Sequence, residues 1–276
     1  MIPNETLFSF ALGSYPVSMP SLSLAIPAYN EEASIEGTVW MYLGALRRAA
    51  SDFEIILLDD GSTDRTRAII DRLAAEHPGI IRTVCHERNQ GIARAYRDVQ
   101  LAAQKEFVLL LWADGQYTPS VIPACLALAE SCDLVLCKRR EKHYGFYRAT
   151  ISWLYRSLCH LCFGFDLQDP GGVKMVRRSL LDAIPIRSRS VFQEPERVIR
   201  ATWGGCRIGV VEVECNRRLA GKASGGSVQL VLSAFRDLCL LWWQDCFMRR
   251  VRRFFARRIT RIQLTCPVEN WVSSGV

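Results

Sequence analysis

The stretch FEIILLDDGS at residues 53–62 is an apolar run that ends in two carboxylates, a glycine and a serine. Its first six residues predict a strand, because a nearly continuous apolar run is typical of a parallel sheet buried on both faces. The tetrapeptide at residues 59–62 has two interpretations when taken alone. It predicts either a turn that caps the next helix or a loop that binds a ligand.

The same pattern recurs on both sides of this stretch. Apolar runs that predict further strands lie at residues 21–27, 80–85, 107–112 and 133–137. Segments with helical spacing separate them, at residues 34–49, 63–76, 91–103 and 121–131. This alternation of strand and helix predicts an α/β fold, with a mostly parallel sheet flanked by helices.

Polar residues gather where four of these strands end. They are Asn30 and Glu31, Asp59 and Asp60, Arg88 and Asn89, and Asp114. In a parallel sheet the carboxyl ends of the strands share one edge, and ligands bind outside that edge. We therefore expect Tyr29, Asp60, Asn89 and Asp114 to meet in one cleft.

The regular alternation stops after residue 138. We expect a helix at 147–163, a loop and short strand at 168–178, a helix at 196–203, a strand at 207–215 and an apolar helix at 227–247. The last helix has a narrow polar stripe: Gln229, Ser233, Arg236, Asp237 and Gln244. Such an amphipathic helix favours a position in a membrane interface, and the alternative is burial against the domain or in an oligomer.

The net charge of +7 is concentrated near the end of the sequence. Seven arginines lie between Arg249 and Arg261 with no acidic residue among them, so the rest of the chain is neutral. This distribution argues against nucleic-acid binding by the body and favours contact of the tail with anionic lipid. We expect residues 1–20 to form a loose leader, 21–226 a catalytic domain, and 227–276 a membrane-associated helix and tail.

The eleven cysteines form no regular framework. An odd number of cysteines, without a secretory signal, indicates a reducing cytosol. Cys159 and Cys162 make one CxxC pair without a second pair at ligand spacing. We interpret them as small apolar residues on a helix rather than as metal ligands.

The residues at the expected edge suit a nucleotide-sugar. Tyr29 can stack on a base, and Asp59 or Asp60 can accept hydrogen bonds from base and ribose. Asp114 can hold a divalent cation, Mg²⁺ or Mn²⁺, because hard cations prefer carboxylate oxygens and keep other positions for phosphate and water. The cation would stabilise the diphosphate that leaves.

Longer motifs make a family resemblance specific. They are IPAYNEE (26–32), LLDDGSTDRT (57–66), ERNQGIARA (87–95), ADGQYTP (113–119), DPGGVKMVRRSLLD (169–182) and residues 194–218, with Gly-Lys at 221–222. Over residues 21–226 the chain resembles family 2 glycosyltransferases, in particular the dolichol-phosphate mannose synthase branch and its bacterial polyprenyl-phosphate relatives. The resemblance implies the GT-A fold, a Rossmann-like sheet flanked by helices, with amphipathic helices after it.

The resemblance also implies residue roles. The positions that match donor binding are Pro27, Tyr29, Glu31, Asp59, Asp60, Asn89 and Gly91. Those that match phosphate binding on the acceptor side, including a flap over the phosphates, are Arg139, Arg148, Ser152, Arg218 and Lys222. Asp114 and Gln116 match the metal and diphosphate positions, and Asp114 and Asp169 match catalytic positions near the reaction centre.

Two departures from the family pattern concern the phosphates. The family has Asp-x-Asp after the fourth strand, whereas this chain has Trp112-Ala113-Asp114. One carboxylate is therefore missing, which weakens metal binding or shifts coordination to Gln116 and the donor. We expect Trp112 to be a core residue. In the flap, Ala223 and Ser224 follow Lys222 where relatives often have Ser-Lys.

The choice of acceptor follows from what the reaction needs. A sugar hydroxyl needs a general base, whereas a lipid phosphate oxygen is already an anion and needs only positioning. Cations suited to phosphate follow the sheet: Lys138, Arg139, Arg140, Lys142 and Arg148. We expect an inverting enzyme at the cytoplasmic membrane face that transfers mannose or glucose to a polyprenyl phosphate, with a membrane-protein partner as a further possibility. The alternatives are transfer to a glycan hydroxyl and a catalytically decayed, partner-binding subunit.

Overall fold

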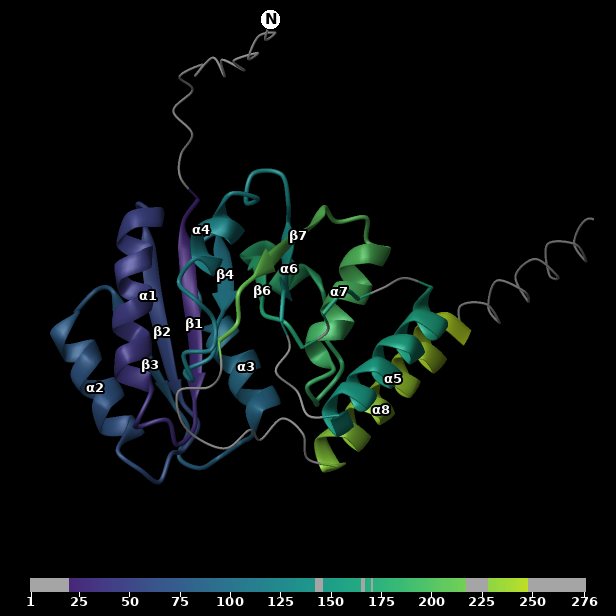
Figure 1. Ribbon diagram of the computed structural model, residues 1–276, viewed down its shortest axis with the longest axis horizontal. Coiled ribbons are helices and arrows are strands. Elements are labelled where there is room, and N and C mark those ends of the chain that lie inside the picture. The colour runs from purple at the N-terminus through teal and green to yellow at the C-terminus, as the bar shows by residue number, and fades with distance from the viewer. Residues whose placement is uncertain (1–19, 142–145, 165–166, 170, 217–227, 248–276) are drawn as a thin grey trace, which may run out of the picture.

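The computed structural model of the chain describes residues 20–141, 146–164, 167–169, 171–216 and 228–247 (Figure 1). Within these residues the strands form one seven-stranded sheet in the order β3-β2-β1-β4-β6-β5-β7. Their bounds are β1 Leu22–Ala28, β2 Phe53–Asp59, β3 Ile81–Cys85, β4 Phe107–Leu110, β5 Leu134–Arg139, β6 Lys174–Arg177 and β7 Ile208–Val213. Only β6 runs antiparallel to its neighbours among these paired strands. The expected mostly parallel α/β sheet is confirmed.

Helices cover both faces of the first four strands. On one face α1 (Ile35–Ala49), α2 (Thr66–Glu76) and α4 (Val121–Leu126) pack over the larger apolar core. On the opposite face α3 (Ile92–Leu101) packs over a second cluster. The chain thus moves outward from β1 to β3 along one face and returns along the other to place β4 on the far side of β1. In α/β sheets this reversal of strand order is where ligands bind.

The other half of the sheet carries a third apolar cluster. It joins β5 and β6 to α5 (Phe146–Phe163), α7 (Gln193–Trp203) and α8 (Val228–Leu241). Figure 1 shows α5 and α8 side by side at the edge of the molecule. Cys159 and Cys162 belong to this cluster, as expected for small apolar residues.

Several expected element bounds are wrong. The fourth strand ends at Leu110 rather than at residue 112, and α4 ends at Leu126 rather than at residue 131. Helix α6 (Arg178–Ala183) was not among the expected elements, and α7 begins at Gln193 rather than at residue 196. After Leu241 the helix continues as the π-helix η1, Trp242–Phe247. These errors lie at element ends and in short elements, where tertiary contacts outweigh local pattern.

Helix α8 differs from the expected interfacial helix on one of its faces. Asp237, expected in a polar stripe, is buried and accepts hydrogen bonds from the backbone N–H groups of Arg189 and Ser190, both at 3.0 Å. Ala234 and Leu238 are buried beside it. A carboxylate that caps two amides at an apolar interface holds the helix against the body. This face therefore matches the alternative, burial against the domain.

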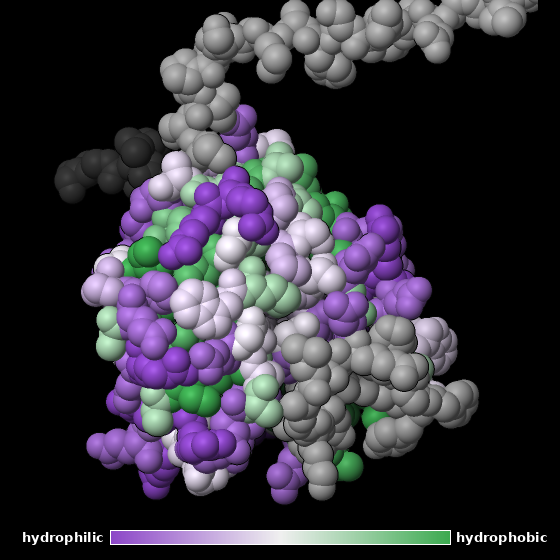
Figure 2. Space-filling view, turned by 60° about the vertical axis from the view of Figure 1, so that its left-hand side comes forward, coloured by the Kyte–Doolittle hydropathy of each residue, from purple (hydrophilic) through white to green (hydrophobic). Residues whose placement is uncertain are grey.

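The outward faces of α5, α8 and η1 are rich in apolar side chains. Large exposed side chains there are Trp153, Leu154, Leu161, Val228, Leu232, Phe235, Leu240, Trp242 and Trp243. By contrast, mostly hydrophilic side chains cover the side of the molecule that comes forward in Figure 2, where α1 and α2 lie. No helix in the described part of the chain has the length and apolar character needed to cross a membrane. Residues 1–19 of the expected leader and residues 248–276 of the expected tail lie outside the described residues.

Candidate functional site

Four loops line the edge at which β1 to β4 end. Asn89 follows β3, Asp60 follows β2, Tyr29 follows β1 and Asp114 follows β4. Because these strands are neighbours in the order β3-β2-β1-β4, three strand spacings of about 4.8 Å separate the outer two, roughly 14 Å in all. The structure thus brings the four predicted residues to one edge of the sheet.

The Asp60 carboxylate joins the end of β2 to the start of α3. Its Oδ1 accepts a hydrogen bond from the backbone N–H of Gln90 at 2.8 Å, and its Oδ2 accepts one from Gly91 at 2.9 Å. Gly91 is the N-cap of α3, so the carboxylate also lies at the positive end of the helix dipole. Asp60 therefore fixes the loop that contains Asn89.

His86 extends this network, although the sequence interpretation did not single it out. Its Nδ1 lies 2.6 Å from Oδ1 of Asp60, and its Nε2 lies 3.1 Å from Oδ2 of Asp98 on α3. It is the first residue after β3. The rule that polar residues at strand ends form the site, applied to this histidine, would have found it.

Gly61 is required where the two loops touch. Its φ is +67°, and a Cβ at this position would lie 2.4 Å from the carbonyl carbon of Arg88. A side chain would therefore push the two loops apart. The glycine of the DDGS motif allows the close approach on which the Asp60 hydrogen bonds depend.

Asp59 has a different position from its neighbour. It is buried, and its Oδ1 accepts a hydrogen bond from the backbone N–H of Ser62 at 3.1 Å. This bond reaches three residues along the chain and closes a local turn, so the turn interpretation of DDGS fits Asp59, whereas the Asp60 carboxylate bonds the loop after β3. Successive residues of a strand point to opposite faces, which separates the two carboxylates.

The loop after β1 is held by the loop after β2. The backbone N–H of Glu31 donates to Oγ1 of Thr66 at 2.8 Å, and the backbone N–H of Thr63 donates to Oδ1 of Asn30 at 2.8 Å. The Glu31 carboxylate accepts a hydrogen bond from Ser34 Oγ at 2.7 Å, at the start of α1. Tyr29 between these anchors is 43% exposed and presents its ring at the surface. Pro27 lies within β1, opposite Leu58.

Asp114 is buried beneath the loops rather than displayed on the surface. Its Oδ1 accepts a hydrogen bond from the backbone N–H of Gln116 at 3.1 Å. Burial raises the pKa of Tyr42 on α1 well above its ordinary value, and the nearby charge of Asp114 adds to this effect. Asp114 therefore lies between the end of β4 and α1.

Trp112 is half-buried and packs against Tyr96 of α3, with ring centroids 5.0 Å apart. It packs against the apolar clusters on both faces of the sheet but stays partly exposed, at the border of the core rather than inside it. The side chain that replaces the first Asp of the family motif thus stabilises the junction of β4 and α3. Within the described residues, no group of three or more His, Cys, Asp or Glu side chains is placed to hold a metal ion.

Asp169 and Arg139 form one ion pair. Oδ2 and Oδ1 of Asp169 accept hydrogen bonds from Nε and Nη2 of Arg139 at 2.8 and 2.9 Å. The two residues had been expected in separate roles. Because β6 is antiparallel, its starting end lies at the edge where β4 and β5 finish, and this brings the preceding loop with Asp169 to Arg139 at the end of β5.

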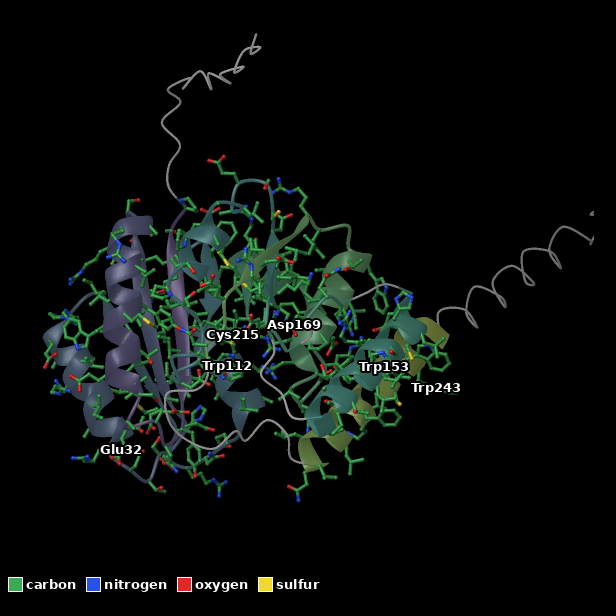
Figure 3. All side chains as sticks on the ribbon, in the orientation of Figure 1. Glu32, Trp112, Trp153, Asp169, Cys215 and Trp243 are labelled. Atoms are coloured by element: carbon green, nitrogen blue, oxygen red, sulfur yellow. The ribbon has the colours of Figure 1, made fainter. Side chains whose placement is uncertain are left out.

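Cys215 lies beside this pair and was missed in the sequence. Burial raises the pKa of its thiol, Arg139 opposes that rise, and the charges of Asp114 and Asp169 add to it. Figure 3 shows Cys215, Asp169 and Trp112 near the centre of the molecule. The backbone N–H of Asn216 donates to the Gln116 carbonyl at 2.7 Å. The segment that leads toward residue 217 therefore crosses the Asp114 loop.

The structure describes only some of the other residues expected on the acceptor side. Ser152 is half-buried on α5, next to Trp153, which Figure 3 shows on the far side of α7 from Asp169. The side chain of Arg148, and all of Arg218 and Lys222, lie outside the described residues.

Comparisons with known proteins were made by sequence and by fold. A sequence model of the family described as Glycosyl transferase family 2 matches residues 23–185. Among curated relatives, the undecaprenyl-phosphate 4-deoxy-4-formamido-L-arabinose transferase of Proteus mirabilis (strain HI4320) is 29% identical over 174 residues, 62% of this chain and 53% of that protein. The protein of the same name from Shewanella sediminis (strain HAW-EB3) is 29% identical over 213 residues, 76% of this chain and 63% of that protein. The chain spans about half the length of most of these relatives.

Solved structures share the fold. Glucosyl-3-phosphoglycerate synthase from Mycobacterium tuberculosis, in complex with Mn²⁺, uridine diphosphate and phosphoglyceric acid, superposes with a TM-score of 0.64 and 22% identity, covering 81% of this chain and 78% of that one. Its complex with Mg²⁺ and uridine diphosphate gives a TM-score of 0.63 and 21% identity, covering 79% and 78%. At this identity the likeness supports the fold alone.

The Asp60 network leads to a prediction about the loop. We expect Asp60→Asn to lower the free energy of unfolding by about 1–3 kcal/mol, because a buried carboxylate that accepts hydrogen bonds from two backbone amides is lost. Hydrogen exchange at the Gln90 and Gly91 amides should accelerate. Asp71→Asn on the exposed face of α2, where Asp71 is bonded to Arg67, is the matched control and should cost less than about 0.5 kcal/mol. Unchanged exchange at both amides in Asp60→Asn would contradict the assignment.

Proposed function

The chain belongs to glycosyltransferase family 2, and we propose that it is an inverting transferase that moves a sugar from a nucleotide-sugar to a polyprenyl phosphate. The observation that carries the proposal is the row of four loops at the switch in strand order, with Asp60 locking the loop after β3 to the end of β2. A row of roughly 14 Å accommodates an extended nucleoside diphosphate.

The donor site in this proposal uses Tyr29, Asp60 and Asn89 around the nucleoside. Tyr29 offers an exposed ring for stacking on the base. A carboxylate has about four lone-pair positions, and Asp60 uses three of them for His86, Gln90 and Gly91. One position on Oδ2 remains to accept an N–H from the base. Pro27, Glu31, Asp59 and Gly91 would hold the loops around the donor in place.

The diphosphate would lie over Asp114 and Gln116. A divalent cation fits there with one protein carboxylate, because Mg²⁺ is commonly held by one or two carboxylates together with substrate phosphates. Such a cation would neutralise charge on the diphosphate. The complexes of the synthase from Mycobacterium tuberculosis with Mn²⁺ or Mg²⁺ and uridine diphosphate support this choice. Trp112 supplies no oxygen ligand. The phosphate oxygens of the donor would therefore provide more of the cation's ligands than in relatives with two carboxylates.

The acceptor phosphate would approach Arg139. Asp169 holds the Arg139 guanidinium through two parallel hydrogen bonds, which fixes the plane of the fork that meets a phosphate. Asp169 thus acts by positioning a cation near the reaction centre. By resemblance, Arg148, Ser152, Arg218 and Lys222 complete the phosphate site.

With a phosphate acceptor, the proposed reaction needs no general base. A phosphate oxygen attacks the anomeric carbon of the sugar in line, as the bond from that carbon to the nucleoside diphosphate oxygen breaks. The configuration at the carbon is inverted. The nucleophile is already an anion, so orientation and charge compensation supply the catalysis.

A membrane surface is the proposed partner of α5, α8 and η1. Their outward faces carry exposed tryptophans, leucines and a phenylalanine, the composition that settles at a lipid interface. The relatives from Proteus mirabilis and Shewanella sediminis are named as undecaprenyl-phosphate transferases, which supports a lipid acceptor. We place the enzyme peripherally at the cytoplasmic face.

Transfer assays test the proposal directly. Purified chain would be given radiolabelled UDP- and GDP-linked glucose, mannose and pentose donors, with vesicles that contain or lack undecaprenyl phosphate. We expect label in the lipid fraction only with the lipid phosphate, and mannose or glucose as the preferred sugar. A parallel reaction would supply soluble sugars in place of vesicles, and label in those sugars instead would favour a hydroxyl acceptor. No binding of any nucleoside diphosphate in calorimetry with Mn²⁺ would indicate a decayed fold.

Trp112 allows a test of the metal site. We expect Trp112→Asp to lower the Mn²⁺ concentration needed for half-maximal UDP binding by about tenfold, because a second carboxylate joins Asp114. The loss of the Tyr96 contact should cost about 1 kcal/mol of stability. Trp112→Phe, which keeps an aromatic ring and adds no ligand, should leave the Mn²⁺ dependence unchanged. Equal Mn²⁺ dependence in both folded variants would contradict a cation at Asp114.

A further inference from the structure

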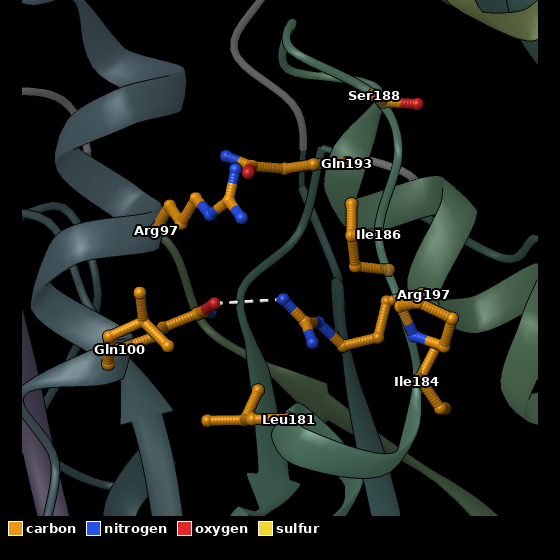
Figure 4. A pocket seen from close by; sticks show the side chains of 10 residues that line it. Arg97, Gln100, Leu181, Ile184, Ile186, Ser188, Gln193 and Arg197 are labelled. Atoms are coloured by element: carbon orange, nitrogen blue, oxygen red, sulfur yellow. Dashed lines mark hydrogen bonds between the residues drawn. The ribbon is translucent and has the colours of Figure 1, made fainter.

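A pocket of about 220 Å³ lies away from the four loops. Its walls are α3, α7 and the segment 181–188 that precedes α7 (Figure 4). At about 30 Å³ for each water molecule, this volume holds about seven waters. The proposed transfer reaction uses none of its lining side chains.

One wall of the pocket is polar. Figure 4 shows Arg97 reaching from α3 toward Gln193 of α7, with Ser188 beyond them. Arg97 is exposed at the rim of the pocket, and in the described part of the chain no carboxylate lies within ion-pair distance of it. A guanidinium that faces a pocket without a counter-charge is suited to bind an oxyanion.

A second guanidinium lies deeper in the same pocket. Arg197 is only 5% exposed, and its Nη2 donates to Oε1 of Gln100 at 2.9 Å. Its Nε is buried and has no hydrogen-bond partner in the described part of the chain. Buried donors are rarely left without an acceptor, so an occupant of the pocket that accepts this hydrogen bond would complete the network.

The local charge is positive. The carboxylate of Glu194 lies 3.6 Å from Arg197, and its charge also acts on Lys174, a lysine whose pKa burial lowers. The charge of Asp169 also acts on Lys174, whereas Arg97 adds a further positive charge at the mouth of the pocket. Buried charges are stable when they are compensated, and an anion in the pocket would provide that compensation.

The opposite wall is apolar. It is formed by Leu101, Leu181, Ile184, Pro185 and Ile186. We propose that this pocket binds a small organic oxyanion, a carboxylate or phosphate ester with a short hydrocarbon part, whose charged group lies between Arg97 and Arg197. The hydrocarbon part would lie against Leu181 and Ile184. Because Gln193 also donates to the Ala93 carbonyl in the first turn of α3, the occupant would tie α7 to that helix.

Calorimetry on the full chain with hexyl phosphate, hexanoate and inorganic phosphate tests this site. We expect hexyl phosphate or hexanoate to bind with a Kd of about 1 mM or tighter, and inorganic phosphate to bind more weakly because it lacks the apolar part. The stronger of the two hexyl probes identifies the charged group.

Two charge-reversal variants distinguish binding in the pocket from nonspecific electrostatic attraction to the protein surface. Arg97→Glu should weaken binding at least tenfold, whereas Arg48→Glu, the same change of charge on an exposed position of α1, should leave it unchanged. Arg97→Gln, with a smaller perturbation, should weaken binding in the same direction, and unfolding midpoints check that all variants fold. Equal weakening by Arg97→Glu and Arg48→Glu, binding that Arg97→Glu does not affect, or no binding by the intact chain would each overturn the proposal.

Discussion

The hydrogen bonds from the Gln90 and Gly91 amides to the Asp60 carboxylate are the constraint on which the candidate site depends. They connect the end of β2 to the N-cap of α3, the helix that covers the face of the sheet opposite α1 and α2. Two loops more than 25 residues apart in the chain are thereby held at contact distance. Gly61 makes this contact possible, because a side chain at that position would meet the backbone of Arg88. The negative charge lies where the dipole of α3 favours it, so one carboxylate satisfies two amides and a helix end together.

The second half of the site depends on a strand that runs against the others. In a fully parallel sheet, the loop before β6 would lie at the opposite edge from Asp114. The antiparallel direction of β6 reverses this and brings Asp169 to Arg139. Gly172 permits the approach, since a Cβ there would lie 2.2 Å from the carbonyl oxygen of Cys137. The fold thus brings this ion pair to the same edge of the sheet as Asp114 without the need for a long loop.

The sequence predicted those parts of the structure that repeat with a regular period. Continuous apolar runs located β1 to β5, and polar residues at their ends located Tyr29, Asp60, Asn89 and Asp114. It did not predict the strand order or the direction of β6, because both depend on contacts between distant segments. The sequence also could not show that Asp59 and Asp60 have different hydrogen-bond partners. Adjacent carboxylates differ only in the face of the sheet toward which each side chain points. Asp237 was misplaced for a related reason: its partners are backbone amides at residues 189 and 190, which no helical pattern reveals.

The central claim is that the four loops form one site for a nucleoside diphosphate. The most direct measurement is a crystal structure of the chain with UDP and Mn²⁺. The account predicts electron density for the base beside Tyr29 and Asp60, and for the diphosphate above Asp114. Density for the nucleotide away from this edge of the sheet, or an occupied site that touches only one of the four loops, would contradict it.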